Sequence, residues 1–121
     1  MAIADRKERA LRERENLILA HSDAMLAESG YLGLNLDEVA RRIEYSKATI
    51  YNHFKSKEDL VLAVAVSHLL TRTELFARAL TFEGTTRERM FVIGAADVIL
   101  AKVHPHWFPI MQLVRTQSIW E

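Results

Sequence analysis

Apolar residues recur at helical spacing between residues 34 and 60, and this stretch organises the rest of the chain. Four of them fall at i, i+3, i+4 and i+7, the spacing of one face of a helix: Leu36, Val39, Ala40 and Ile43. Asn35 stands where an N-cap is expected, and Glu38 three residues later completes a capping-box pattern. The stretch therefore predicts a short helix that begins after Asn35.

A second short helix is predicted after an interruption of this pattern. Residues 44–46 break the apolar spacing, and Ser46 can cap a helix that begins at Lys47. On that helix Ile50 and Phe54 share one face, which we expect to be buried. Two short helices joined by a three-residue turn are the arrangement called helix-turn-helix.

A long helix is predicted before this stretch, over residues 4–29. Its first dozen residues alternate in charge, which is typical of a solvated helical extension. A basic arm that reaches a DNA backbone is the alternative. Its second half is apolar, and we expect five residues there to face a core: Leu17, Ile18, Ala24, Met25 and Leu26. Gly30 is placed to end the helix.

Three helices are predicted after it. Ser56 caps a long one that continues to about Leu80 and is apolar on nearly all sides over its first half, so we expect it to be buried there. The next begins after Thr85, which forms a capping box with Glu88, and ends near residue 103. A last helix is expected to begin near Trp107 or Pro109 and to continue to the end of the sequence. The predicted fold class is all-α.

Composition excludes several classes of protein. Half of the 121 residues are hydrophobic, which argues against disorder, and the absence of cysteine excludes disulfides and thiolate metal sites. The N-terminus is too charged for a signal peptide, and the longest apolar run, residues 60–66, is far shorter than the roughly 18 residues needed to cross a membrane. We expect a cytoplasmic protein that does not bind a membrane.

The sequence offers no enzyme chemistry. It has no nucleophile–base pair, no glycine-rich phosphate loop and no paired carboxylates in a known motif, so we predict neither catalytic residues nor a cofactor. His104 and His106, with Asp97 nearby, form a weak metal pattern, and a helix boundary explains them better. The aromatic and methionine residues of the second half are either core or the lining of an apolar ligand pocket.

The runs LDEVARRI and TIYNHFKSKEDL resemble the TetR family of bacterial transcriptional regulators. The resemblance covers roughly residues 14–64, and it departs from the family at Glu44, where a glycine is usual. It implies a three-helix DNA-binding head at residues 1–57, followed at residues 58–121 by a connecting helix and the first helices of a regulatory and dimerisation domain. The chain is then either a fragment or a short variant.

The resemblance further implies a sequence-specific DNA-binding transcriptional regulator, a ligand-responsive repressor that acts as a homodimer on double-stranded operator DNA. A small-molecule effector would bind the C-terminal helices. The alternative function is a helical module that uses the same scaffold for protein–protein contacts.

Eight residues are candidates for contact with DNA. They are Lys47, Ala48, Thr49, Tyr51, Asn52, His53, Lys55 and Lys57. The N-terminal end of a recognition helix enters the major groove, where lysine, asparagine and methyl groups read base edges. Tyrosine suits a phosphate contact, and a lysine at a helix start adds to a site that already favours anions. The alternative is an ordinary solvated helix surface.

Charge is uninformative over the whole chain and suggestive only locally. The formal net charge at neutral pH is zero, with 16 basic and 16 acidic residues. The three lysines of the candidate set lie in or just after the second short helix, whereas the nearby acids Asp37, Glu38 and Glu44 belong to the first helix and the turn. This asymmetry favours a basic surface on the second helix.

Overall fold

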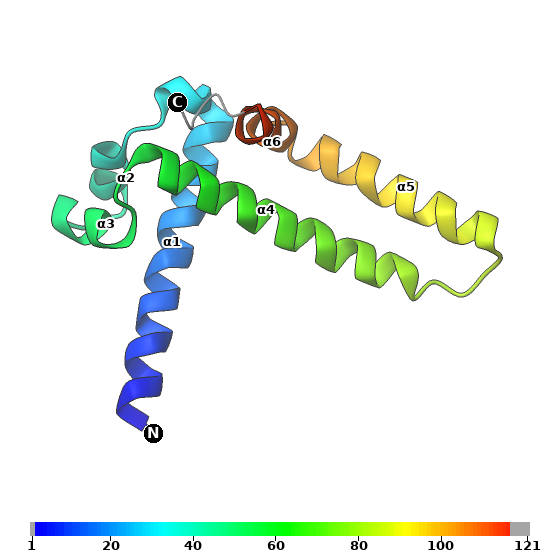
Figure 1. Ribbon diagram of the computed structural model, residues 1–121, viewed down its shortest axis with the longest axis horizontal. Coiled ribbons are helices and arrows are strands. Elements are labelled where there is room, and N and C mark those ends of the chain that lie inside the picture. The colour runs from blue at the N-terminus through cyan, green and yellow to red at the C-terminus, as the bar shows by residue number, and fades with distance from the viewer. Residues whose placement is uncertain (1, 117–121) are drawn as a thin grey trace. The chain divides into compact units, whose positions relative to one another are not determined.

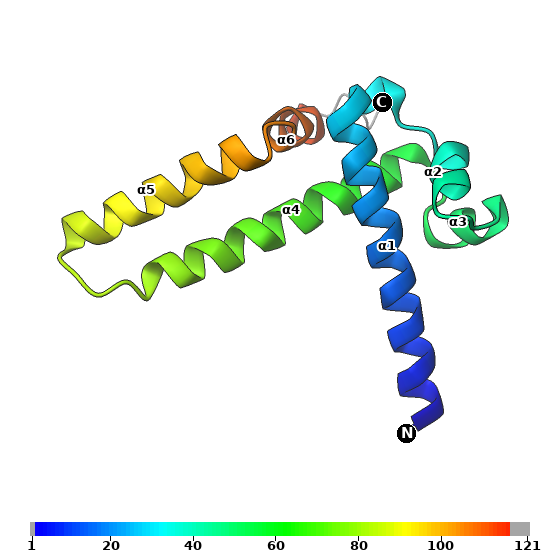
Figure 2. The same ribbon diagram turned by 180° about the vertical axis from the view of Figure 1, so that it is seen from behind.

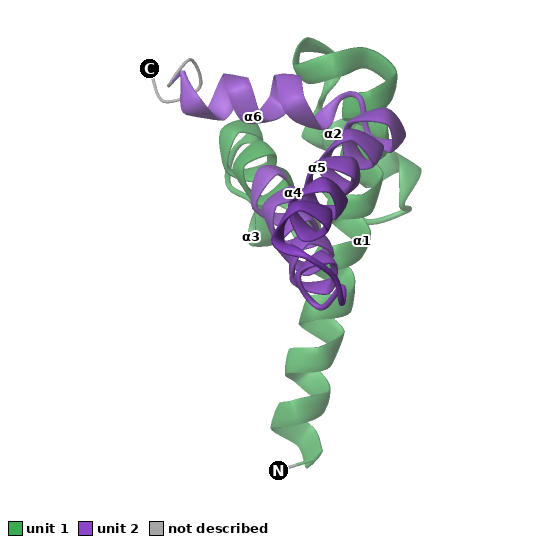
Figure 3. Cartoon of the chain, turned by 90° about the vertical axis from the view of Figure 1, so that its right-hand side faces the viewer, with its two compact units in different colours: residues 1–64 green, residues 65–121 purple. Residues whose placement is uncertain are grey.

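The computed structural model describes residues 2–116, and every regular element in that range is an α-helix, so the all-α prediction is confirmed. The helices are α1 (Ala2–Gly33), α2 (Leu36–Arg42), α3 (Lys47–His53), α4 (Lys57–Leu80), α5 (Thr86–Val103) and α6 (Trp107–Arg115) (Figure 1). The chain divides into two compact units, residues 1–64 and residues 65–121 (Figure 3). This boundary lies inside α4, seven residues beyond the predicted division at 57/58, which as a functional division stays a prediction.

The core of the first unit is built from the helix faces that the sequence pattern predicts. Buried apolar side chains come from all four of its helices: Ile18, Met25, Leu26, Leu36, Val39, Ala40, Ile50, Phe54, Leu60, Val61 and Val64. Two expectations for α1 were wrong, because Leu17 is 38% exposed and Ala24 also faces solvent. The buried stripe instead follows residues 18, 22, 25 and 26, and Ser22 fits into it by donating its hydroxyl to the Ile18 carbonyl at 2.7 Å.

The ends of the helices follow their predicted caps. The Oδ1 of Asn35 accepts from the backbone N–H groups of Asp37 at 2.8 Å and Glu38 at 3.3 Å. The Ser46 hydroxyl caps α3 through Thr49, and the Ser56 hydroxyl accepts from the Asp59 N–H at 3.1 Å at the start of α4. Each cap satisfies a backbone donor that a helix start otherwise leaves unpaired.

Two capping-box predictions had different outcomes. At α5 the box is complete, since the Glu88 carboxylate accepts from the Thr85 N–H at 2.7 Å and the Glu88 N–H donates to the Thr85 hydroxyl at 3.3 Å. At α2 only half of it forms. The Glu38 carboxylate turns away from Asn35 and binds Arg41 and Arg42 instead, because two guanidinium groups lie within one helical turn of it.

Backbone geometry ends the long part of α1 at the predicted residue. Gly30 has φ of 71°, outside the helical region, and residues 31–33 form a short helical turn beyond it. A left-handed φ is open to glycine at little cost, which is why a glycine stands where the helix stops.

The second unit is an antiparallel pair of helices followed by a short helix. The C-terminal part of α4 and the whole of α5 lie alongside each other in both views of the ribbon (Figures 1 and 2). The guanidinium Nε of Arg72 donates to Asp97 at 3.1 Å and ties the two helices together. The helix α6 ends at Arg115, with Thr116 as its C-cap, which is earlier than expected; Trp120 and its neighbours at 117–121 lie outside the described residues.

Much of the apolar surface of the second unit faces solvent. On α5 alone Met90, Phe91, Val98, Ile99 and Val103 are each more than half exposed, and Phe91 reaches 77%. On α4 the residues Leu69 and Leu70 are also exposed, although we expected this half of the helix to be buried on several sides. Among the described residues the small side chains Ala65, Ala79 and Ala96, with Ile110, are the buried apolar ones of this unit.

By length and composition α4 is long and apolar enough to cross a membrane. The uninterrupted apolar run of residues 60–66 did not indicate this. Within the described range, α4 is the one helix that meets this criterion. This is weak evidence, because the core helix of a water-soluble protein passes the same test. Leu60, Val61 and Val64 are fully buried in the first unit, as in such a core helix.

Candidate nucleic-acid interface

One face of α3 is exposed and carries most of the predicted contact residues. Residues at i, i+1, i+4 and i+5 point to solvent together: Lys47, Ala48, Tyr51 and Asn52. Lys55, two residues after the end of the helix, is exposed as well. Tyr51 is 45% exposed. The opposite face is anchored, since Ile50 is fully buried and Phe54 is 8% exposed. The helix therefore presents a polar and basic surface on a fixed base.

Lys47 is not the free cation that the sequence suggested. Its Nζ lies 3.3 Å from the Asp37 carboxylate at the start of α2, and both side chains remain largely in solvent. The acids of the first helix are therefore not separate from the basic surface of the second. A screened pair of this kind contributes little to stability, so Lys47 can exchange Asp37 for another acceptor at low cost.

The basic residues of α2 are internally neutralised. The side-chain hydrogen bond from Arg41 is the largest cause that holds the pKa of Glu38 at about 2, and Arg42 adds to it. The same pairing raises the pKa of Arg41. Arg42 also donates to Glu28 of α1 at 3.1 Å. At neutral pH the two arginines are thus occupied with acids of their own unit, and Lys55 and Lys57 supply positive charge beside α3 for which no ion pair is described.

The two candidate residues at the sides of α3 are partly withdrawn from solvent. Thr49 is half-buried, and its hydroxyl lies 2.8 Å from the hydroxyl of Ser46, the cap residue. His53 keeps only 4% of its side-chain surface, and its Nδ1 lies 3.3 Å from the Glu15 carboxylate on α1. No sequence pattern indicates the contact between His53 and Glu15, because the two residues are 38 positions apart.

Lys57 packs against an aromatic ring. Its Nζ lies 4.0 Å from the centroid of the Tyr31 ring, a cation–π distance. The Tyr31 hydroxyl donates to Glu58 at 3.3 Å. Burial, followed by the Glu58 charge, raises the pKa of the Tyr31 hydroxyl. This small cluster fixes the start of α4 next to the turn that follows Gly30.

The turn between α2 and α3 has the backbone geometry that usually calls for glycine. Glu44 has φ of 60°, and it is the one non-glycine residue of the described range with a positive φ. A side chain in this left-handed region costs about 1–2 kcal/mol relative to the ordinary helical region. The chain therefore keeps the turn that the family resemblance implies even with glutamate at this position.

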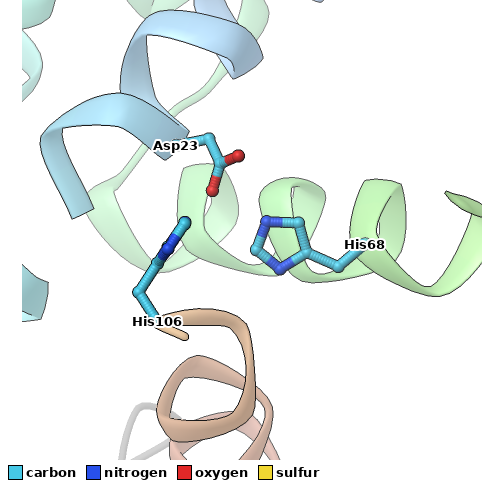
Figure 4. Close-up of side chains that lie close together, drawn as sticks. All are labelled: Asp23, His68 and His106. Atoms are coloured by element: carbon cyan, nitrogen blue, oxygen red, sulfur yellow. The ribbon is translucent and has the colours of Figure 1, made fainter. Parts of the chain in front are cut away.

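The second unit contains a cavity of about 430 Å³ between α4, α5 and α6. One of its walls is Trp107, whose ring stacks on those of His104 and His68, with ring centroids 3.9 Å and 4.0 Å apart. The His106 ring meets the His68 ring edge-on at 5.9 Å, as Figure 4 shows for these two side chains. Trp107 is thus enclosed between two imidazoles, a packing that the sequence pattern did not suggest.

Comparison with known proteins identifies the first unit. Residues 18–64 match the model of the family described as bacterial regulatory proteins, tetR family. Over 78 residues the chain is 32% identical to the HTH-type transcriptional activator FasR of Mycolicibacterium smegmatis, which covers 64% of this chain and 36% of that protein. Over 53 residues it is 43% identical to uncharacterised HTH-type transcriptional regulators of Mycobacterium bovis and Mycobacterium tuberculosis, covering 44% of this chain and 26% of each relative.

The matched segment thus spans about a third or less of the relatives' own length. The family match at residues 18–64 lies within the first unit and includes the capped pair α2 and α3 and the turn at Glu44. Sequence resemblance and family model agree: residues 18–64, within the first unit, belong to the TetR family of bacterial regulatory proteins.

Proposed function

We propose that the first unit binds double-stranded operator DNA and that the protein is a sequence-specific transcriptional regulator. The observation that carries this proposal is the exposed face of α3, which is polar and basic while Ile50 and Phe54 anchor the other side. A helix held in this way can enter a major groove with its N-terminal residues against the base edges.

The eight candidate residues take different roles in this proposal. Lys47, Ala48 and Asn52 are exposed and chemically suited to base edges. Tyr51 and Lys55 are exposed and suited to phosphates, and they give position rather than sequence preference.

The three half-buried candidates serve the interface more indirectly. Thr49 supports the cap of α3 and offers its methyl group at the edge of the face. His53 positions α3 against α1 through Glu15. Lys57 leaves the Tyr31 ring to bind a phosphate, an exchange that a charge-assisted phosphate contact can offset because a cation–π contact is worth about 0.5–2 kcal/mol.

We further propose a homodimer that acts in the cytoplasm as a repressor and is released by a small molecule bound in the second unit. Two-fold related heads read two half-sites of a palindrome about one helical turn of DNA apart, roughly 34 Å. The relative FasR is named a transcriptional activator, so a separate experiment must distinguish repression from activation. In a promoter-reporter assay a repressor lowers transcription when its operator overlaps the promoter, and a rise contradicts repression.

Salt dependence tests DNA binding. Operator fragments are first selected from random duplexes, and affinity is then measured by fluorescence anisotropy from low to high salt. With about four ionic phosphate contacts per dimer, the slope of log K against log salt is expected near −4. The Lys55→Ala variant should weaken binding to all sequences alike and make the slope shallower, whereas Glu83→Gln, in the loop before α5, is the matched control and should change neither.

Two outcomes contradict the proposal. A slope near zero would show that the ionic phosphate contacts on which the proposal depends are not made. Absence of selected DNA together with intact self-association favours the other candidate, a helical module for protein–protein contacts.

A further inference from the structure

The cavity of the second unit has a size that suits a small molecule. Its volume of about 430 Å³ falls within the range of ligand pockets in proteins. If each non-hydrogen atom occupies about 30 Å³, the share of one water molecule in the liquid, the cavity holds a molecule of roughly 10–15 such atoms. Most of its lining is apolar, and it includes Leu69, Leu100, Ala101, Phe108 and Met111.

One wall of the cavity is a stack of three aromatic rings. Trp107 is stacked between His68 and His104 with interplanar angles of 16° and 2°. Since both faces of the indole are covered, Trp107 offers its edge and not a stacking surface to a ligand. The cavity therefore favours a ligand whose apolar part fills the space without stacking on an aromatic ring of the protein.

The guanidinium group of Arg72 lines the cavity, and its two terminal nitrogens are available to a ligand. Arg72 donates from Nε to the Asp97 carboxylate at 3.1 Å, and its Cζ lies 5.0 Å from the Phe76 ring centroid. Among the described residues, its two terminal nitrogens make no other hydrogen bond. A guanidinium oriented by Nε and by ring packing offers two parallel N–H groups, the arrangement that matches the two oxygens of a carboxylate.

The charges around the cavity match an anion with a single negative charge. Arg72 and Asp97 cancel each other, and Arg115 on the last turn of α6 adds one positive charge to the lining. The remaining polar residue of α6, Gln112, is neutral. A phosphate group carries nearly two negative charges at neutral pH and is matched less well by this set.

We propose that this cavity binds an apolar monocarboxylate of about 10–15 non-hydrogen atoms, with its carboxylate on the terminal nitrogens of Arg72 and its body among the side chains of α5 and α6. This deepens the proposed function, on which it rests for the regulatory meaning of binding: the monocarboxylate class is the effector of the regulator.

A fluorescence titration of the whole chain tests the proposal. The sequence has two tryptophans, so Trp120→Phe leaves Trp107, in the cavity wall, as the reporter. The probes are 4-phenylbutanoate, its neutral analogue 4-phenylbutan-1-ol, the cation 4-phenylbutylamine and the dianion 4-phenylbutyl phosphate. The carboxylate should bind at least tenfold tighter than the other three, since a hydrogen-bonded ionic contact gives a factor of roughly 10–100.

Matched variants separate a direct contact from a structural role. Arg72→Gln should weaken 4-phenylbutanoate roughly tenfold or more and leave the alcohol unchanged. Asp97→Asn breaks the same pair between α4 and α5 but keeps the guanidinium, so it should bind the carboxylate at least as tightly as the parent chain. Ala101→Phe fills the cavity and should abolish binding of both compounds while the helical circular dichroism stays unchanged.

Several results overturn the proposal. They are equal affinity for the carboxylate and the alcohol, tighter binding of the phosphate, or equal losses in Arg72→Gln and Asp97→Asn. These measurements contain no DNA, so their failure leaves the DNA-binding proposal standing, and a failure of operator binding leaves the ligand class standing.

Discussion

At the scale of single residues, the molecule places unlike chemical groups in close pairs that change what each can do. Lys47, a candidate for contact with bases, forms an ion pair with Asp37. Lys57, a candidate for contact with a phosphate, forms a cation–π contact with Tyr31. Both contacts are weak enough to be exchanged for DNA. The pairs keep long cations ordered near the surface, which lowers the entropy lost on binding.

Replacing Lys47 or Asn52 distinguishes contacts with base edges from contacts with the phosphate backbone. Each alanine variant should relax the preference at one base position of each half-site, at a cost of roughly 1–3 kcal/mol for a lost bidentate contact. Binding to a panel of operators that differ at single positions measures this. The matched control is Asp37→Asn, which frees Lys47 and should strengthen binding. A uniform loss across the panel would make both residues backbone contacts.

Glu44→Gly should stabilise the first unit by about 0.5–1 kcal/mol. The gain is the relief of the left-handed strain at φ of 60°, reduced by the larger entropy of glycine in the unfolded chain. Chemical denaturation followed by circular dichroism measures it. Glu44→Ala removes the same carboxylate but keeps a Cβ, so it should stay within about 0.5 kcal/mol of the parent. Equal effects of the two variants would assign the gain to charge and not to backbone geometry.

At the scale of elements, local sequence decides where helices begin. Four side-chain caps, at Asn35, Ser46, Ser56 and Thr85, form as predicted, because each requires only residues two or three positions away. The exception at α2 has a local cause as well, since Glu38 meets stronger partners within the same helix.

Contacts between elements could not be read from the sequence in the same way. The pairs Glu15 with His53 and Arg72 with Asp97 join residues 38 and 25 positions apart, and helical periodicity carries no information about which helices meet. The exposure of Leu17 has the same origin, since the face of α1 that is buried depends on its neighbours. Of the candidate interface, therefore, the exposed face of α3 was predictable, and the partners of Lys47, His53 and Lys57 were not.

The complete capping box of α5 makes the stability of that helix depend on pH. The backbone hydrogen bond from Thr85, followed by that from its hydroxyl, lowers the pKa of Glu88 below its ordinary value of 4.5. A carboxylate with a lowered folded-state pKa contributes stability above its unfolded pKa and loses it as pH falls through the folded one. The parent chain should therefore lose more thermal stability between pH 7 and pH 3 than Glu88→Gln does.

Thermal unfolding followed by circular dichroism at a series of pH values measures this difference. Glu83→Gln, which removes an exposed carboxylate just outside the box, is the control and should follow the parent curve. Parallel curves for the parent and Glu88→Gln would show that the box does not respond to protonation.

At the scale of the whole molecule, the two units differ in how completely they bury their apolar residues. The first has a core that includes side chains from all its helices, whereas the second leaves most of the large apolar residues of α5 in solvent. Exposed apolar side chains in this number are typical of a surface that associates with another protein. We therefore expect the 121-residue chain to self-associate through the second unit.

Sedimentation velocity over a range of concentrations tests this expectation. Phe91→Ser and Ile99→Ser remove two exposed apolar side chains of α5 and should shift the chain toward monomer without loss of helix content. Tyr51→Ser, at an exposed position of α3, is the control and should leave the association unchanged. A clean monomer that binds a palindromic operator tightly and releases it with a small molecule would contradict the expectation.

The N-terminal half of α1 has a kinetic consequence. Residues 2–14 are exposed on all sides, and the salt bridge between Glu8 and Arg12 is the one side-chain pair described among them. Helix without tertiary packing has little cooperative support, so these turns open and close independently of the core. A single continuous helix thus spans two regimes of backbone protection: amides before residue 15 exchange with solvent by local fraying, and those around Ile18 and Met25 only when the first unit opens.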